Sequence, residues 1–193
     1  RFNGTLNEGE TKQHPVGGDT ELDIVYPEGM VLYPGSMNLV SVSYTLNNSS
    51  VDYLFNDVEI TGVAHWNASA GIWDDPSEVS ELKPLRAYQV VVPEDQNIQV
   101  ISDSKFEPTQ NLVSPPSMSV EAGNTYAVGY TGTADIRSIA DTLNPSIEGK
   151  YGIVTGPYIN GTSVYSTDDY SKDMKKYYGY WVPINEDGTL HGF

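Results

Sequence analysis

The strongest constraint in this sequence is an alternation of apolar and polar residues with a period of two. Valine, isoleucine, leucine and tyrosine share one face over residues 20–26, 37–46, 58–62, 88–92 and 126–130. Successive side chains of a β-strand point to opposite faces of a sheet, so the pattern predicts half-buried strands. Clusters of turn-forming residues separate them, at residues 33–35, 47–50, 74–76, 114–116 and 121–124. We therefore predict an all-β fold, a single β-sandwich or jelly-roll domain.

Two segments predict short helices within this β fold. Apolar residues recur with helical spacing at Ile136, Ile139, Ala140 and Leu143. Pro145 predicts the end of this first helix. In residues 167–178, two aspartates precede three lysines. The dipole of a helix favours that order of charge, so a second helix is predicted there.

The first 13 residues differ from the rest, and we treat them as an N-terminal arm ahead of a β-sandwich domain over residues 14–193. The arm has few apolar residues, but Phe2, Gly4 and Leu6 would share one face if it were extended. One interpretation is a frayed terminus. The other is a donor strand that pairs with the open sheet edge of another subunit.

Charge and composition exclude several classes of function. The net charge is −16, which argues against binding to nucleic acid or to an anionic membrane surface. Hydrophobic residues make up 38% of the chain, enough for a core, and no window approaches the apolar length of a membrane span. The absence of cysteine excludes disulfides and thiol catalysis.

Several features point to an exported protein. The sequence starts with arginine, which indicates either a mature form or a trimmed chain, and we expect a mature form after signal-peptide cleavage, at the cell surface or outside the cell. Glycosylation sequons, Asn-x-Ser/Thr, occur at Asn3, Asn47, Asn48, Asn67 and Asn160. The alternative is that asparagine, serine and threonine simply share polar loops. Abundant sequons without cysteine fit an archaeal surface protein.

Motifs for catalysis are absent, and we predict that the chain is not an enzyme. There is no nucleophile elbow, phosphate-binding loop or zinc-protease motif, and the three histidines lack ligand spacing. No cofactor is required by the sequence. Calcium is the one metal for which carboxylates cluster, at Asp74, Asp75, Asp168, Asp169 and Asp187. A solvated acidic surface is the alternative.

Residues 17–63 contain an ordered series of motifs: GDTELDI at residues 18–24, LYPGS at 32–36, VSYTLNNS at 42–49 and DVEI at 57–60. The order and spacing of these motifs resemble those of the camelysin/TasA family of secreted fibre subunits. The segment SVEAGNTY, at residues 119–126, is similar to a later turn and strand of that family. Archaeal relatives form bundling pili, surface threads and cannula-type tubes.

The resemblance implies a jelly-roll subunit that polymerises head to tail by donor-strand complementation. The arm of one subunit would enter a groove of the next, with Phe2, Gly4 and Leu6 facing the groove. Adhesion, bundling of neighbouring filaments and a role in biofilm matrix follow as expected functions, with calcium at acidic clusters or subunit interfaces. The alternative function is a secreted carbohydrate-binding or adhesin module that uses Trp66, Trp73 or Trp181 as a sugar platform.

Overall fold

The computed structural model describes residues 29–109, 115–132 and 134–192. Its strands are β1 (Gly29–Leu32), β2 (Asn38–Ser41), β3 (Gly62–Asn67), β4 (Ile72–Trp73), β5 (Ala87–Val91), β6 (Gln99–Ser102), β7 (Ser117–Val120), β8 (Thr125–Gly129), β9 (Ile136–Ser138), β10 (Val154–Ile159), β11 (Thr162–Thr167), β12 (Asp173–Lys175), β13 (Gly179–Pro183) and β14 (Gly188–His191). The helices are α1 (Val51–Leu54) and α2 (Ile139–Ile147), and the 3-10 turns are η1 (Pro76–Glu78) and η2 (Asp103–Lys105).

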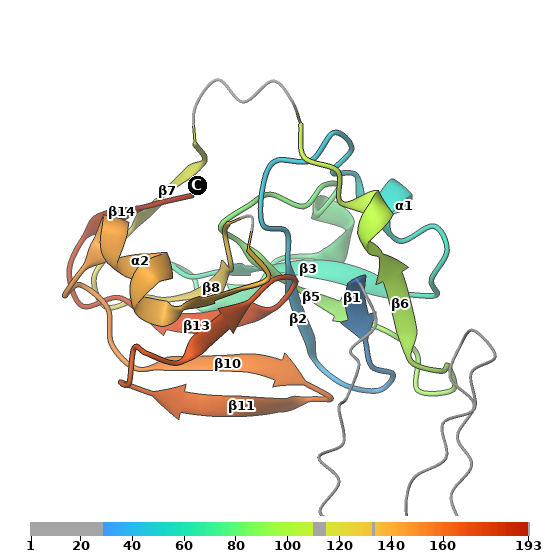
Figure 1. The fold of residues 1–193 in the computed structure, drawn as a ribbon. Coiled ribbons are helices and arrows are strands. Elements are labelled where there is room, and N and C mark those ends of the chain that lie inside the picture. Colours follow the sequence, from blue (N-terminus) through green and yellow to red (C-terminus); the bar gives the residue numbers. More distant parts are fainter. Residues whose placement is uncertain (1–28, 110–114, 133, 193) are drawn as a thin grey trace, which may run out of the picture.

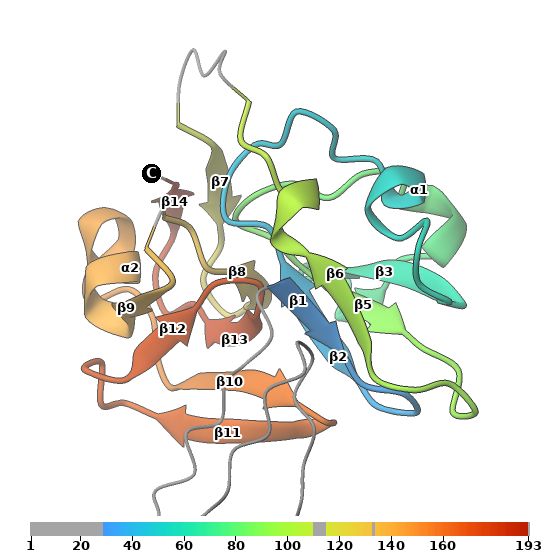
Figure 2. The same ribbon diagram turned by 45° about the vertical axis from the view of Figure 1, so that its right-hand side comes forward.

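The strands form two four-stranded antiparallel sheets, ordered β2-β5-β3-β4 and β11-β10-β13-β8. The pairs β1-β6, β9-β12 and β7-β14 flank them (Figures 1 and 2). The prediction of an all-β sandwich with short helices is confirmed. The predicted strands over residues 88–92 and 126–130 correspond to β5 and β8, each displaced by one residue.

Each sheet has its own hydrophobic core on one face. The first core lies between the β2-β5-β3 sheet, the β1-β6 pair and α1, and includes Leu32, Val40, Leu54, Val90 and Ile101. The second core lies under α2 and the β7-β14 pair, and includes Val128, Ile139, Leu143, Tyr180 and Val182. Figure 1 shows the two groups of elements side by side.

A thin third layer joins the two sheets, and we call it the seam. Leu39 and Ala87 from one sheet meet Ala127 from the other. Two glycines that are register partners, Gly129 and Gly179, allow the backbones to come close there. A Cβ atom on Gly179 would lie 2.6 Å from Leu39 Cγ, so a larger residue does not fit without movement.

One residue of the C-terminal half completes the first core. Tyr177 is 7% exposed and packs on Phe106, with ring centroids 4.6 Å apart. Its hydroxyl donates to Asp103, which also pairs with Lys176 Nζ at 3.3 Å. Burial, and then the bond to the Asp103 carboxylate, raise the pKa of Tyr177. The backbone of Tyr177 adopts φ 69°, a left-handed conformation that is costly for a bulky residue.

Both helix predictions need correction. The first helix starts at Ile139 and continues through Pro145 to Ile147, while Ile136 lies in β9. Burial of Ile139, Leu143 and Ile147 in the second core stabilises this longer span.

The predicted helix over residues 167–178 is wrong. The Asp169 carboxylate accepts hydrogen bonds from the Ser171 amide and hydroxyl, which makes a turn rather than a helix start. The chain then enters β12, where Met174 is fully buried and pairs with Arg137.

Two of the observed strands are shorter than the sequence predicts or begin later. The strand predicted over residues 37–46 ends at Ser41, and residues 58–61 form the loop before β3. Helix α1 follows the predicted turn at residues 47–50 and was not predicted. Ser50 caps it by accepting a hydrogen bond from the Tyr53 amide.

Candidate functional site

The predicted donor residues Phe2, Gly4 and Leu6, and the sequon at Asn3, lie outside the described residues. The described part of the chain starts at Gly29, with β1. A receiving surface for an apolar arm would need accessible apolar side chains near a core. We therefore describe the pockets first, and then the tryptophans, acidic residues and sequons.

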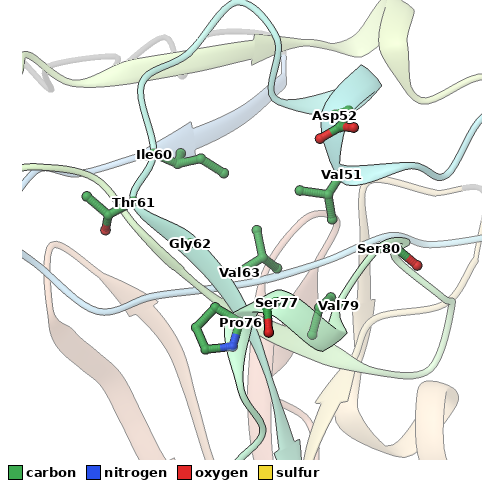
Figure 3. A pocket seen from close by; sticks show the side chains of 10 residues that line it. All are labelled: Val51, Asp52, Ile60, Thr61, Gly62, Val63, Pro76, Ser77, Val79 and Ser80. Atoms are coloured by element: carbon green, nitrogen blue, oxygen red, sulfur yellow. The ribbon is translucent and has the colours of Figure 1, made fainter.

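The first pocket has a volume of about 340 Å³ and lies between α1, the start of β3 and the segment after η1. Its apolar lining comes from Val51, Ile60, Val63, Pro76 and Val79. Figure 3 shows the side chains of Val51, Ile60 and Val63 directed into a common space, with Ser80 directed away from it. These aliphatic side chains also pack on the first core, so the pocket opens onto that core.

A second pocket of about 390 Å³ adjoins the first. The two pockets share three lining residues, Thr61, Gly62 and Pro76. The rest of the second pocket is lined by Ala64, Trp73, Asp74, Asp75, Gln89 and Val91. Gly62 and Pro76 lie close together in the shared wall, since a Cβ atom on Gly62 would be 3.0 Å from Pro76 Cβ.

Capping interactions fix the segments around the pockets. The Asp75 carboxylate accepts hydrogen bonds from the Ser77 amide at 2.9 Å and hydroxyl at 2.8 Å, at the start of η1. The bond from the Ser77 amide, followed by that from its hydroxyl, lowers the pKa of Asp75. Pro76 then occupies the first position of η1, which suits its fixed φ.

A lysine side chain caps the C-terminal end of α1. The ammonium of Lys105 contacts the carbonyl oxygens of Tyr53 and Leu54, each at 3.4 Å, and the side chain of Asn56. The Asp57 carboxylate lies 2.5 Å from the same nitrogen. A cation at this place satisfies carbonyl groups that the helix leaves unpaired, and it holds α1 against η2.

The three tryptophans gather into one cluster, although they come from β3, β4 and β13. Trp66, Trp73 and Trp181 contact one another edge to face, with ring centroids 5.1–5.7 Å apart. Trp66 Nε1 donates to the Thr125 carbonyl at 2.8 Å, which ties β3 to β8. The indoles are half-buried and pack on the seam, so much of their surface is used to join the sheets.

Four of the five acidic residues proposed for calcium have protein partners, and the fifth, Asp168, is exposed directly after β11. Asp74 lies 3.0 Å from His65 Nδ1, and Asp187 accepts from the Ala122 amide at 2.8 Å. Asp75 and Asp169 hold turns, and the bonds from Ser171 lower the pKa of Asp169. Among the described residues, no three acidic or histidine side chains meet as a metal site. Calcium at a subunit interface stays a prediction.

Four sequons lie in the described structure. Asn47, Asn48 and Asn160 are exposed, and Asn67 is half-buried at the end of β3. The Asn67 side chain accepts from Ser69 Oγ at 2.9 Å, and that of Asn48 accepts from Ser50 Oγ at 2.9 Å. Asn160 instead accepts from Ser36 Oγ at 3.1 Å. Glycosylation at these positions stays a prediction.

No protein-family model, curated protein or solved structure matches this chain. No helix in the described ranges is both long and apolar enough to cross a membrane. Sequence reasoning did not find the two pockets, because their walls come from segments that only the fold brings together. The cluster of tryptophans had no spacing signal either.

Proposed function

We propose that this chain is the subunit of an extracellular filament or tube, assembled when the N-terminal arm of one copy docks on the first core of the next. The observation that carries the proposal is the pair of adjoining pockets, the first of which exposes aliphatic side chains of that core. The resemblance of residues 17–63 to the camelysin/TasA fibre subunits supports it. Cell-surface adhesion, bundling and a place in biofilm matrix are the functions that such a polymer would serve.

The arm would present its two large apolar side chains on one side if it were extended. In an extended strand Phe2 and Leu6 point to the same side, about 13 Å apart. Gly4 lies midway between them on the same side and has no side chain to hinder a close approach. Phe2 and Leu6 would both face the acceptor surface at the first pocket, while Asn3 would point away with any glycan.

The expected affinity of the arm for its acceptor is modest and depends on the ionic conditions. Full burial of a phenylalanine and a leucine contributes about 1.5–3 kcal/mol each. Association costs about 4 kcal/mol or more in lost freedom, so backbone hydrogen bonds along the arm must add to the affinity. Each copy carries a charge of −16, so salt or calcium should favour assembly by screening the repulsion.

Electron microscopy of four proteins tests the proposal. We expect filaments or tubes from the intact chain, and none from a variant that lacks residues 1–11 or from Phe2→Asp, which would bury a charge. Asn7→Asp adds the same charge on the opposite side of the extended arm and should still assemble. Normal filaments from the shortened variant would refute the proposal.

A binding assay locates the acceptor. A labelled peptide of residues 1–13 should bind the shortened protein, and Ile60→Asp should weaken that binding by placing a carboxylate in the first pocket. Ile98→Asp, at an exposed residue in another loop, is the matched control. Equal binding by both variants would exclude this pocket as the acceptor.

Carbohydrate binding is the second candidate, and the gathering of Trp66, Trp73 and Trp181 favours it. Trp73 lines the second pocket together with Gln89, and indole and amide groups are common in ligand sites. A glycan screen with the intact chain and with Trp73→Ala would test this function. Binding that Trp73→Ala abolishes, from a protein that never polymerises, would replace the first proposal.

A further inference from the structure

Strand β11 has an open edge in the described structure. It stands at the end of the order β11-β10-β13-β8, and Figures 1 and 2 show it as the outermost strand of its sheet. In the part of the chain that the structure describes, it pairs with β10 alone. The other ends of the two large sheets are shorter or bridged: β4 has two residues, Tyr178 bridges β2, and Arg86 bridges β8.

The sequence of β11 lacks the usual protection of an edge. Its six residues, TSVYST, include no charge, proline or glycine. Natural edge strands are commonly blunted by lysine, by proline or by shortness, because an open row of amide and carbonyl groups pairs readily with another strand. A six-residue uncharged edge on a chain with a net charge of −16 is therefore a specific feature.

Side-chain contacts hold the strand firmly against its own sheet. Tyr165 donates its hydroxyl to the Asp173 carbonyl at 2.7 Å and stacks on Tyr180. Thr155 Oγ1 and Ser166 Oγ lie 2.9 Å apart. Val164, on the opposite face from Tyr165, is 60% exposed. A rigid strand loses little conformational freedom when a partner adds to it.

We infer that β11 pairs with β11 of a second copy, antiparallel and about a twofold axis at Val164. Such an axis, perpendicular to the sheet, keeps each face on its own side, so a residue meets one from the same face. Val164 then lies opposite the partner's Val164, and Thr162 lies opposite the partner's Ser166. The two exposed valines cover each other, and the flanking hydroxyls can bond across the strands.

Charge decides between antiparallel and parallel pairing. Asp168 and Asp169 follow directly after β11. Parallel pairing would bring these aspartates of both copies side by side. In the antiparallel pair each Asp168 is four residues from the axis, so the two are about 26 Å apart. That is about three Debye lengths at physiological ionic strength, and their repulsion is largely screened.

The pairing extends the proposed function without using the same surface. The biological role of the β11 pairing, which is to join neighbouring filaments laterally, rests on the proposed function. The contact itself needs β11 and not the arm. Its failure and the failure of arm docking can therefore be measured separately in the full-length chain.

Disulfide trapping tests the pairing directly, because the natural sequence has no cysteine. Full-length Val164→Cys should form a disulfide-linked dimer under mild oxidation several-fold faster than Ile98→Cys, whose parent residue is similarly exposed at 56%. Thr162→Cys should crosslink no faster than the Ile98 variant, since two copies of residue 162 lie on opposite sides of the axis. A mixture of Thr162→Cys and Ser166→Cys should give the mixed dimer.

Each outcome bears on the inference. Equal rates for Val164→Cys and Ile98→Cys would overturn it, and fast self-crosslinking of both Thr162→Cys and Val164→Cys would replace the antiparallel arrangement by a parallel one. The Val164→Cys rate should persist when Phe2→Asp is added, which separates β11 pairing from arm docking. In sedimentation, Val164→Lys should abolish lateral association of the cysteine-free chain while circular dichroism confirms its fold.

Discussion

Substitutions of Tyr177 allow a sharp test of the structure. Loss of the ring should lower the free energy of unfolding, whereas relief of the left-handed backbone by glycine should raise it. Phenylalanine at this position removes only the hydrogen bond to Asp103. A bond to a charged group contributes about 1.5–3 kcal/mol. Asp103 keeps Lys176 as a partner at 3.3 Å and is 47% exposed on its side chain, so we expect a loss near the lower end, about 1.5 kcal/mol.

Removal of the ring costs more, and its cost depends on the replacement. Tyr177→Ala should lose about 3–5 kcal/mol, the range for a buried aromatic residue. Tyr177→Gly loses the same contacts but adopts φ 69° freely, whereas alanine pays about 1–2 kcal/mol there. Glycine should therefore be the more stable of the two by about 1 kcal/mol.

Urea unfolding monitored by circular dichroism and tryptophan fluorescence measures these differences. The matched control is Tyr88, which is 2% exposed in β5 and is not among the residues with positive φ. There, glycine should be less stable than alanine by about 0.5–1 kcal/mol. If Tyr177→Ala proves as stable as Tyr177→Gly, the left-handed backbone at this residue is refuted.

Three further predictions concern the seam, the end of α1 and alkaline pH. Gly179→Ala should lower the free energy of unfolding by about 1–3 kcal/mol, because its methyl group meets Leu39; an unchanged melting temperature would mean that the sheets separate without cost. Lys105→Met keeps the aliphatic stem and should cost about 1 kcal/mol, with faster amide exchange in α1; equal exchange would show that the ammonium is not needed. Burial raises the pKa of several tyrosines, and that of Tyr151 to about 12. Their folded pKa values lie above the unfolded value of about 10, so the stability they contribute is complete below pH 10 and is lost as the pH rises beyond it. Tyrosinate absorbance should then rise together with the loss of circular dichroism, and a gradual rise in a folded chain would contradict this.

The sequence predicts those strands in which apolar residues alternate without interruption with polar or small ones. β5 and β8 are of this kind, since valine and tyrosine alternate there with small or polar residues. The C-terminal strands are harder to predict. β10 contains Gly156 and Pro157, and β12 follows a turn whose aspartate and lysines also suit the start and end of a helix. Burial of Met174 decides that case, and burial depends on the whole fold.

The pockets illustrate a second limit. Val51, Ile60 and Val79 stand in three separate segments, and none has a motif that would mark it as part of a site. Their proximity depends on where α1 and η1 settle against β3. The arm could be recognised from sequence because it is apolar at regular positions in a polar segment. Its acceptor could not be recognised, because accessibility is a property of the assembled surface.

The seam has a consequence for the geometry of any assembly. Gly129 and Gly179 let the backbone of the second sheet approach Ser41, Ala87 and Leu39 of the first, which leaves little room for the sheets to shift against each other. The pockets lie on one sheet and β11 on the other. In a polymer built through these two surfaces, the seam would fix the angle between the axial and the lateral contact. The helical rise and twist of a filament, and the spacing of filaments in a bundle, would then both depend on a pair of residues that touch no neighbouring subunit.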